Sequence, residues 1–133
     1  MANRFYGSGN LGNPPELRTV EVNGEPRQVA SLRVYFDRQV PNGDDFEDRG
    51  GFWLNVSLWG ERAEQAVKLL TKGARVTVSG TLVQHTWEDE NGEEASRIEL
   101  NADRVSLDLA RVERVEFRRK SVDDAAEAEH VSG

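Results

Sequence analysis

The sequence predicts one mainly β domain with a single helix. Three observations support this: short stretches of two-residue hydrophobic alternation, one stretch of helical spacing, and turn signals such as Asn23-Gly24 and Asn91-Gly92 between them. A chain of 133 residues has room for one domain with an ordinary core and is short for two.

The clearest alternation lies in residues 51–60, where an apolar face opposes a face with two tryptophans. The apolar face is a core stripe of Phe52, Leu54, Val56 and Leu58. The opposite face carries Trp53 and Trp59 around two polar residues, and the indoles lie roughly 20 Å apart at ~3.3 Å per residue. Because the apolar stripe already serves the core, these indoles are surplus to it.

The N-terminal half predicts further strands. Residues 3–11 alternate but are rich in glycine, which indicates a bulge or a close backbone approach, and an extended pattern resumes over residues 17–22. The Asn23-Gly24 turn leads into a second strand over residues 29–40, and residues 41–51 predict a polar, acidic loop. The inward positions of the second strand are Ala30, Leu32, Val34 and Phe36.

The C-terminal half predicts one helix and more strands. The spacing becomes helical over residues 61–72, with Gly73 placed as the C-terminal cap. Strands follow over residues 75–87 and 97–107, and residues 110–118 alternate like one appended strand. The inward positions of the two longer strands are Val76, Val78, Leu82, Ile98, Leu100 and Ala102.

The order of these elements favours the OB-fold. Its five-stranded barrel has one helix between strands three and four and binds oligonucleotides or oligosaccharides across one face. We expect this domain over residues 1–109 and an appended strand over residues 110–120. Residues 121–133 predict a short, acidic, disordered tail, because they show no apolar periodicity.

Composition excludes several classes of site. There is no cysteine and there are two histidines, which excludes disulfides and thiolate zinc sites and leaves little for a histidine metal site. No phosphate-binding glycine loop or nucleophile elbow is present, so we expect a binding protein rather than an enzyme, without cofactor or metal. With no signal peptide and no run of ~18 apolar residues, we expect a cytoplasmic protein without a membrane partner.

The charge distribution leaves room for a nucleic-acid partner. The net charge of −7 argues against one, but the acid lies mainly in residues 37–50, in residues 88–110 and after residue 120. The sheet can therefore carry a mildly basic groove. The candidate phosphate contacts are Arg4, Arg18, Arg33, Lys72, Arg75 and Arg97. Taken singly, each is also consistent with an ordinary solvated side chain.

A third tryptophan, Trp87, lies on the polar face of the strand predicted over residues 75–87. Flat indoles on a sheet stack bases at ~1–3 kcal/mol per base and tolerate any sequence. The alternative is packing beneath a loop or in an interface, as in an OB-fold module for protein–protein assembly. We favour stacking, because three indoles share the polar faces of neighbouring strands.

Short motifs in the chain resemble those of bacterial single-stranded DNA-binding proteins over roughly residues 3–107. They are Gly9-Asn10-Leu11-Gly12, Pro15-Glu16-Leu17-Arg18, Trp53 with Trp59-Gly60, Ala63-Glu64, Lys72-Gly73, Gly80-Thr81-Leu82, and Trp87 with Asp89 and Gly92. The resemblance implies an OB-fold homotetramer that binds and protects single-stranded DNA, without sequence preference, in replication, recombination and repair at the nucleoid. It implies stacking on Trp53, Trp59 and Trp87. It also implies backbone contacts from Arg4, Arg18 and Lys72.

The chain departs from this family pattern at several places. Val40 stands where members often have another stacking tryptophan, and Leu54 stands where a histidine often helps the subunit contact. Residues 83–86 are not basic, which predicts a shallow salt dependence. The acidic tail is short and ends at Gly133, so we do not expect it to recruit partner proteins, as in a specialised plasmid, phage or conjugative relative. Residues 110–118 are similar to a strand that clamps a neighbouring subunit in some members.

Overall fold

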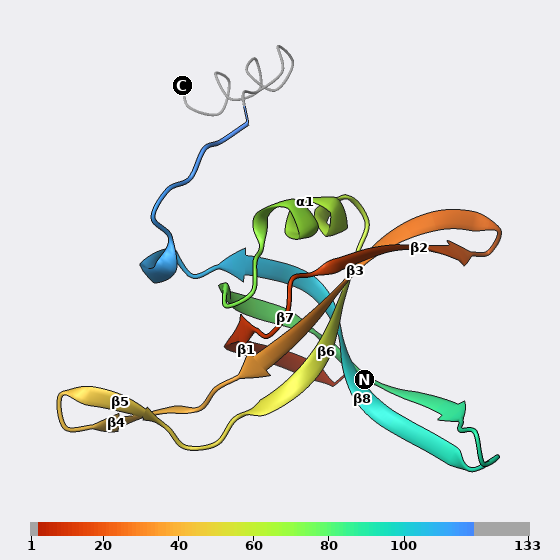
Figure 1. The fold of residues 1–133 in the computed structure, drawn as a ribbon, viewed down its shortest axis with the longest axis horizontal. Coiled ribbons are helices and arrows are strands. Elements are labelled where there is room, and N and C mark those ends of the chain that lie inside the picture. The colour runs from red at the N-terminus through yellow and green to blue at the C-terminus, as the bar shows by residue number, and fades with distance from the viewer. Residues whose placement is uncertain (1–2, 119–133) are drawn as a thin grey trace.

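A closed barrel forms the centre of the molecule, which is described by a computed structural model over residues 3–118 (Figure 1). The barrel strands are β1 (Arg4–Leu11), β3 (Glu25–Phe36), β6 (Phe52–Trp59), β7 (Arg75–Glu88) and β8 (Glu94–Leu107). They are hydrogen-bonded in the order β1-β7-β8-β6-β3, and β1 also pairs with β3 to close the ring. All of these pairings are antiparallel except that of β6 with β8.

The helix α1 (Glu61–Leu69) lies between β6 and β7 in the chain, at the top of the barrel in Figure 1. It packs on β3 and β6 and buries Ala63 and Ala66. Within residues 3–118, five strands thus form the ring, with the helix between its third and fourth strands. The predicted OB-fold is confirmed.

Three hairpins project from the barrel in different directions (Figure 1). We call them the β2–β3 arm, in which β2 (Glu16–Val22) pairs with the first part of β3, the β4–β5 arm, and the β7–β8 arm. Asn23 and Gly24 form the β2–β3 turn with φ of 54° and 81°, as predicted. The prediction of a loop over residues 41–51 was wrong. β4 (Gln39–Asn42) and β5 (Asp45–Asp48) pair there, because backbone pairing does not require the apolar alternation that this polar segment lacks.

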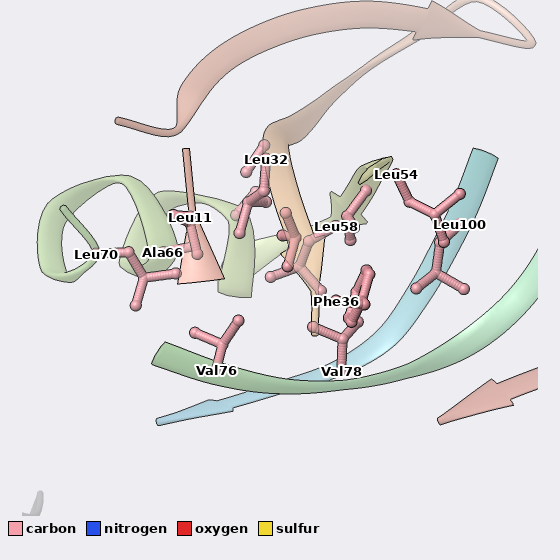
Figure 2. Close-up of a cluster of buried hydrophobic side chains, with 14 residues drawn as sticks. Leu11, Leu32, Phe36, Leu54, Leu58, Ala66, Leu70, Val76, Val78 and Leu100 are labelled. Atoms are coloured by element: carbon pink, nitrogen blue, oxygen red, sulfur yellow. The ribbon is translucent and has the colours of Figure 1, made fainter. Parts of the chain in front are cut away.

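The core follows the predicted alternation, with two exceptions. Figure 2 shows inward side chains from the barrel strands and α1 meeting in one cluster. Phe52 is 50% exposed although it lies on the core face of β6, because it is the first residue of that strand and packs only sideways on Phe5 and Phe36. Ile98 is 51% exposed because it lies on the β7–β8 arm, before the β6–β8 pairing begins at Glu99.

The appended strand predicted over residues 110–118 is absent from the described part of the chain. Leu109–Arg111 form a short 3-10 helix capped by the Asp108 side chain, and residues 112–118 pair with no described strand. Alternation indicates extended backbone, but a strand also needs an edge on which to pair, and the barrel of a single chain is closed. The remainder of this segment and the tail predicted over residues 121–133 lie outside the described residues.

A partly buried ion-pair cluster ties the strand ends together on the side of β4 and β5. Arg75, at the start of β7, binds Asp37 at 2.8 Å, Asp108 at 3.4 Å and the Asn10 side chain at 3.3 Å. Burial raises the pKa of Asp37, but hydrogen bonds from Arg75 and Gln39 outweigh it, so the pKa of this carboxyl lies below its usual range. The cluster joins residues at the ends of β1, β3, β7 and β8.

Replacing Asp37 by Asn should lower the free energy of unfolding by about 2 kcal/mol at pH 7, because it leaves Arg75 short of its main partner. A carboxyl with a depressed pKa stabilises the fold above its unfolded pKa of about 3.9, and this contribution disappears as the pH falls through its native pKa. Urea denaturation should therefore show the parent chain and Asp37→Asn converging below about pH 4.

The matched control is Glu47→Gln, which removes an exposed pair with Arg49 and should change the free energy of unfolding by less than about 0.5 kcal/mol. Equal effects of the two substitutions at pH 7, or a loss for Asp37→Asn that does not shrink as the pH falls below about 4, would contradict the role assigned to the cluster.

Candidate nucleic-acid interface

The outer face of β3, β6 and β8 carries two tryptophans. Strand register pairs Tyr35 with Trp53 at one end of β6 and Val29 with Trp59 at the other. Trp53 is 47% exposed and Trp59 is 39% exposed, whereas Leu54, the residue after Trp53, is buried. The prediction that alternation turns these indoles away from the core is confirmed.

The same face is hollowed into a groove of about 350 Å³, which we call the outer groove. It runs across β2, β3, β6 and β8, and the residues of β6 that line it lie between the two indoles in the strand. Arginines from three strands line it, namely Arg18 of β2, Arg33 of β3 and Arg97 of β8. The fold therefore brings half of the predicted phosphate contacts into one groove.

Trp53 is held on several sides at the edge of this groove. The Tyr35 ring lies 5.2 Å from the indole, and the Arg33 guanidinium lies 5.4 Å from the indole centroid, within cation–π range. The Gly12 backbone lies so close that a side-chain Cβ there would stand 2.6 Å from the indole. Tyr35 is itself fixed, since its hydroxyl donates to Asp48 at 3.0 Å. Trp53 is therefore fixed by its neighbours while much of its surface stays exposed.

Trp59 and Trp87 are anchored by polar neighbours. The Trp59 indole N–H donates to the Asn101 side chain at 3.2 Å. Trp87, on the β7–β8 arm, is 40% exposed, stacks with His85 at 5.7 Å and has the Arg97 guanidinium 5.4 Å from its ring centroid. Trp59 is thus held at one edge and Trp87 by two neighbours, while both indoles keep an exposed surface.

The other three predicted basic residues lie outside the outer groove. Arg4 forms an ion pair with Asp103 at 2.7 Å. In the strand register, Arg4 lies beside Thr81, and Thr81 lies beside Asn101. The hydrogen bonds of Arg4 and Ser79 hold the pKa of Asp103 below its usual range.

Lys72 and Arg75 lie at the other end of the face. Lys72 is exposed in the turn after α1, and this turn is fixed beside Gly12 by the hydrogen bond from the Gly73 N–H to the Leu11 carbonyl. Lys72 thus lies near the Trp53 end of the groove. Arg75 is engaged in the ion-pair cluster described above.

Comparison with known proteins places this arrangement in a family. Residues 2–108 match the family described as "Single-strand binding protein family". The chain belongs to this family. It is 37% identical over 103 residues to a protein of Paenarthrobacter aurescens (76% of this chain, 58% of the relative) and 36% identical over 103 residues to one of Mycobacterium tuberculosis (76% and 61%). Both relatives are named "Single-stranded DNA-binding protein", and the chain spans about 60% of their lengths.

A solved structure supports the fold of this family member. The chain superimposes on the "small single-stranded DNA-binding protein from Streptomyces coelicolor" with a TM-score of 0.68, 21% identity, and coverage of 84% of this chain and 99% of that one. At this identity the likeness concerns the fold, and it agrees with the closed barrel described above.

Sequence reasoning about this family member missed the groups that other strands bring beside the indoles. Glu99 lies beside Asn55 because β6 and β8 run parallel, a pairing that alternation does not reveal. Tyr35 could be placed on the outer face by its parity with Arg33, but its support of Trp53 depends on Asp48 of the unpredicted β4–β5 arm.

Within residues 3–118 no cluster of His, Cys, Asp or Glu is suited to a metal, and no helix there could span a membrane.

Proposed function

We propose that this protein binds and protects single-stranded DNA along the outer groove, largely independently of sequence. The observation that carries the proposal is three outward, partly exposed indoles beside a groove lined by three arginines. Bases stack on Trp53, Trp59 and Trp87, and each stack contributes ~1–3 kcal/mol. The names of the curated relatives support DNA as the ligand.

Phosphates are contacted in this proposal by the arginines of the groove and by cations at its two ends. Within the groove, phosphates contact Arg18, Arg33 and Arg97. Lys72 contacts them near Trp53. Beyond Trp59, the contact comes from Arg4, whose strand neighbour Thr81 pairs with Asn101. We assign Arg75 a structural role, because Asp37 and Asp108 already balance its charge. Since carboxylates also line the groove, the salt dependence should be shallow.

We further propose that the protein acts in replication, recombination and repair, in the cytoplasm at the nucleoid, as a binding protein without a catalytic step. A specialised plasmid, phage or conjugative role is the alternative within the same family. The rival from another class is an assembly module whose indoles are buried against protein. The titration described next separates that rival from DNA binding.

Titration with poly-dT should quench the intrinsic tryptophan fluorescence, and salt should weaken the binding, since it depends on both stacking and phosphate contacts. Trp53→Ala should cost about 1–3 kcal/mol of binding free energy. The control Phe46→Ala removes an aromatic ring that is 69% exposed on the β4–β5 arm, outside the groove, and should leave the affinity unchanged. Fluorescence that does not change with poly-dT even at low salt would refute the proposal.

The same protein is proposed to assemble as a homotetramer, with residues 112–118 clamping a neighbouring subunit. Val115 is 49% exposed and Phe117 is 90% exposed in this extended segment, which pairs with no described strand of its own chain. Docking on a strand of another copy would satisfy its backbone groups and cover both side chains. This supports a clamp that forms only in the oligomer.

Replacing both Val115 and Phe117 by Asp should lower the stability of the oligomer, because two charges would be forced into the docked interface. Analytical ultracentrifugation at high dilution should then show smaller species than the parent chain gives. Phe46→Asp introduces a charge at another exposed aromatic position and should leave the mass unchanged. An unchanged mass for the double variant at every dilution would exclude the clamp.

A further inference from the structure

A carboxylate lies on the β8 wall of the outer groove. Glu99 is beside Asn55 in the parallel β6–β8 pairing, and its side chain is 21% exposed. An anionic group in the wall of a groove that binds a polyanion repels its phosphates. Glu99 holds Arg97, which lies over Trp87, but contact with phosphates gives no reason for a carboxylate facing the groove.

Glu99 lies on a continuous path between two of the indoles. Arg33 covers Trp53 and donates to the Asn55 side chain at 3.0 Å, and Asn55 is the register neighbour of Glu99. On the other side, Arg97 donates to Glu99 Oε1 at 2.6 Å and covers Trp87. A strand that passes from Trp53 to Trp87 along this face therefore crosses Glu99 between the two stacking platforms.

The carboxylate of Glu99 retains the capacity to accept hydrogen bonds from a ligand. The bond from Arg97 reaches Oε1, and an ionised carboxylate can accept about four hydrogen bonds over its two oxygens. The bases of single-stranded nucleic acid expose their Watson–Crick edges to such groups. Arg97 also offsets the charge of Glu99, which lowers the electrostatic cost of this carboxylate to DNA binding.

We propose that Glu99 makes the groove prefer bases that carry an exocyclic amino group, and in particular cytosine over thymine. Cytosine presents its N4 amino donor where thymine presents the O4 acceptor. A carboxylate accepts a hydrogen bond from the first and is repelled by the second. The preference rests on the proposed function, since the base is delivered to Glu99 by stacking, and it is superimposed on sequence-tolerant binding.

The test compares the affinity of the full chain for oligo-dC, oligo-dT and oligo-dU of one length, at neutral pH and fixed salt. Oligo-dC should bind about ten-fold more tightly than oligo-dT, the factor expected for one charge-assisted hydrogen bond. Oligo-dU should bind like oligo-dT, because it keeps the O4 acceptor and lacks only the methyl group. In Glu99→Gln the ratio of the dC and dT affinities should fall to about one, since an amide can turn to serve either base.

The matched control is Glu16→Gln, which removes the same charge from the β2 wall of the same groove. It should strengthen binding to oligo-dC and oligo-dT by equal factors and leave their ratio unchanged. Equal affinity of the parent chain for the two oligonucleotides, or an unchanged ratio in Glu99→Gln, would overturn the role of Glu99 while leaving DNA binding intact. Failure to bind any of the three oligonucleotides would overturn both proposals.

Discussion

The structure depends on the closure of the barrel by β1. This strand pairs with β7 over Arg4–Asn10 and with β3 over Gly9–Leu11, so two partners meet at its end. A side chain at Gly9 would collide with the Tyr35 carbonyl, which explains why a glycine-rich strand stands at the crossing. Closure gives the neighbouring strands one inner and one outer face. β6 places apolar side chains on its inner face and the two indoles on its outer face.

The proposed function depends on the side chains of the outer face, which the core does not require. Because Leu54, Val56 and Leu58 fill the core from β6, the positions between them can hold indoles and polar groups. The cations there are few, and carboxylates accompany them in the outer groove. In the proposed function, this face recognises DNA through aromatic surface more than through charge, which suits a chain with a net charge of −7.

Local patterns predicted much of the fold and the indoles of the site. Alternation placed Trp53, Trp59 and Trp87 outside the core, and the five ring strands lie close to where they were expected. The helix begins as predicted but ends at Leu69, so the prediction of Gly73 as its cap was wrong and Leu70 takes that place. Features that depend on partners distant in the chain could not be predicted. They are the parallel β6–β8 pairing, the exposure of Ile98 on an arm, and the lack, among the described residues, of a strand that pairs with residues 112–118. The sequence shows that Arg75 is charged, but its two aspartate partners lie 38 and 33 residues away, so their ion pairs could not be predicted.

The most direct measurement of the central claim is a nuclear magnetic resonance titration of the isotope-labelled chain with oligo-dT. The chain has three tryptophans, so its three indole N–H signals report on the proposed platforms one by one. The account predicts that all three shift, together with backbone amides of β3, β6 and β8, while the amides of α1 do not. Shifts confined to α1 and the C-terminal segment, with the indole signals unmoved, would contradict it.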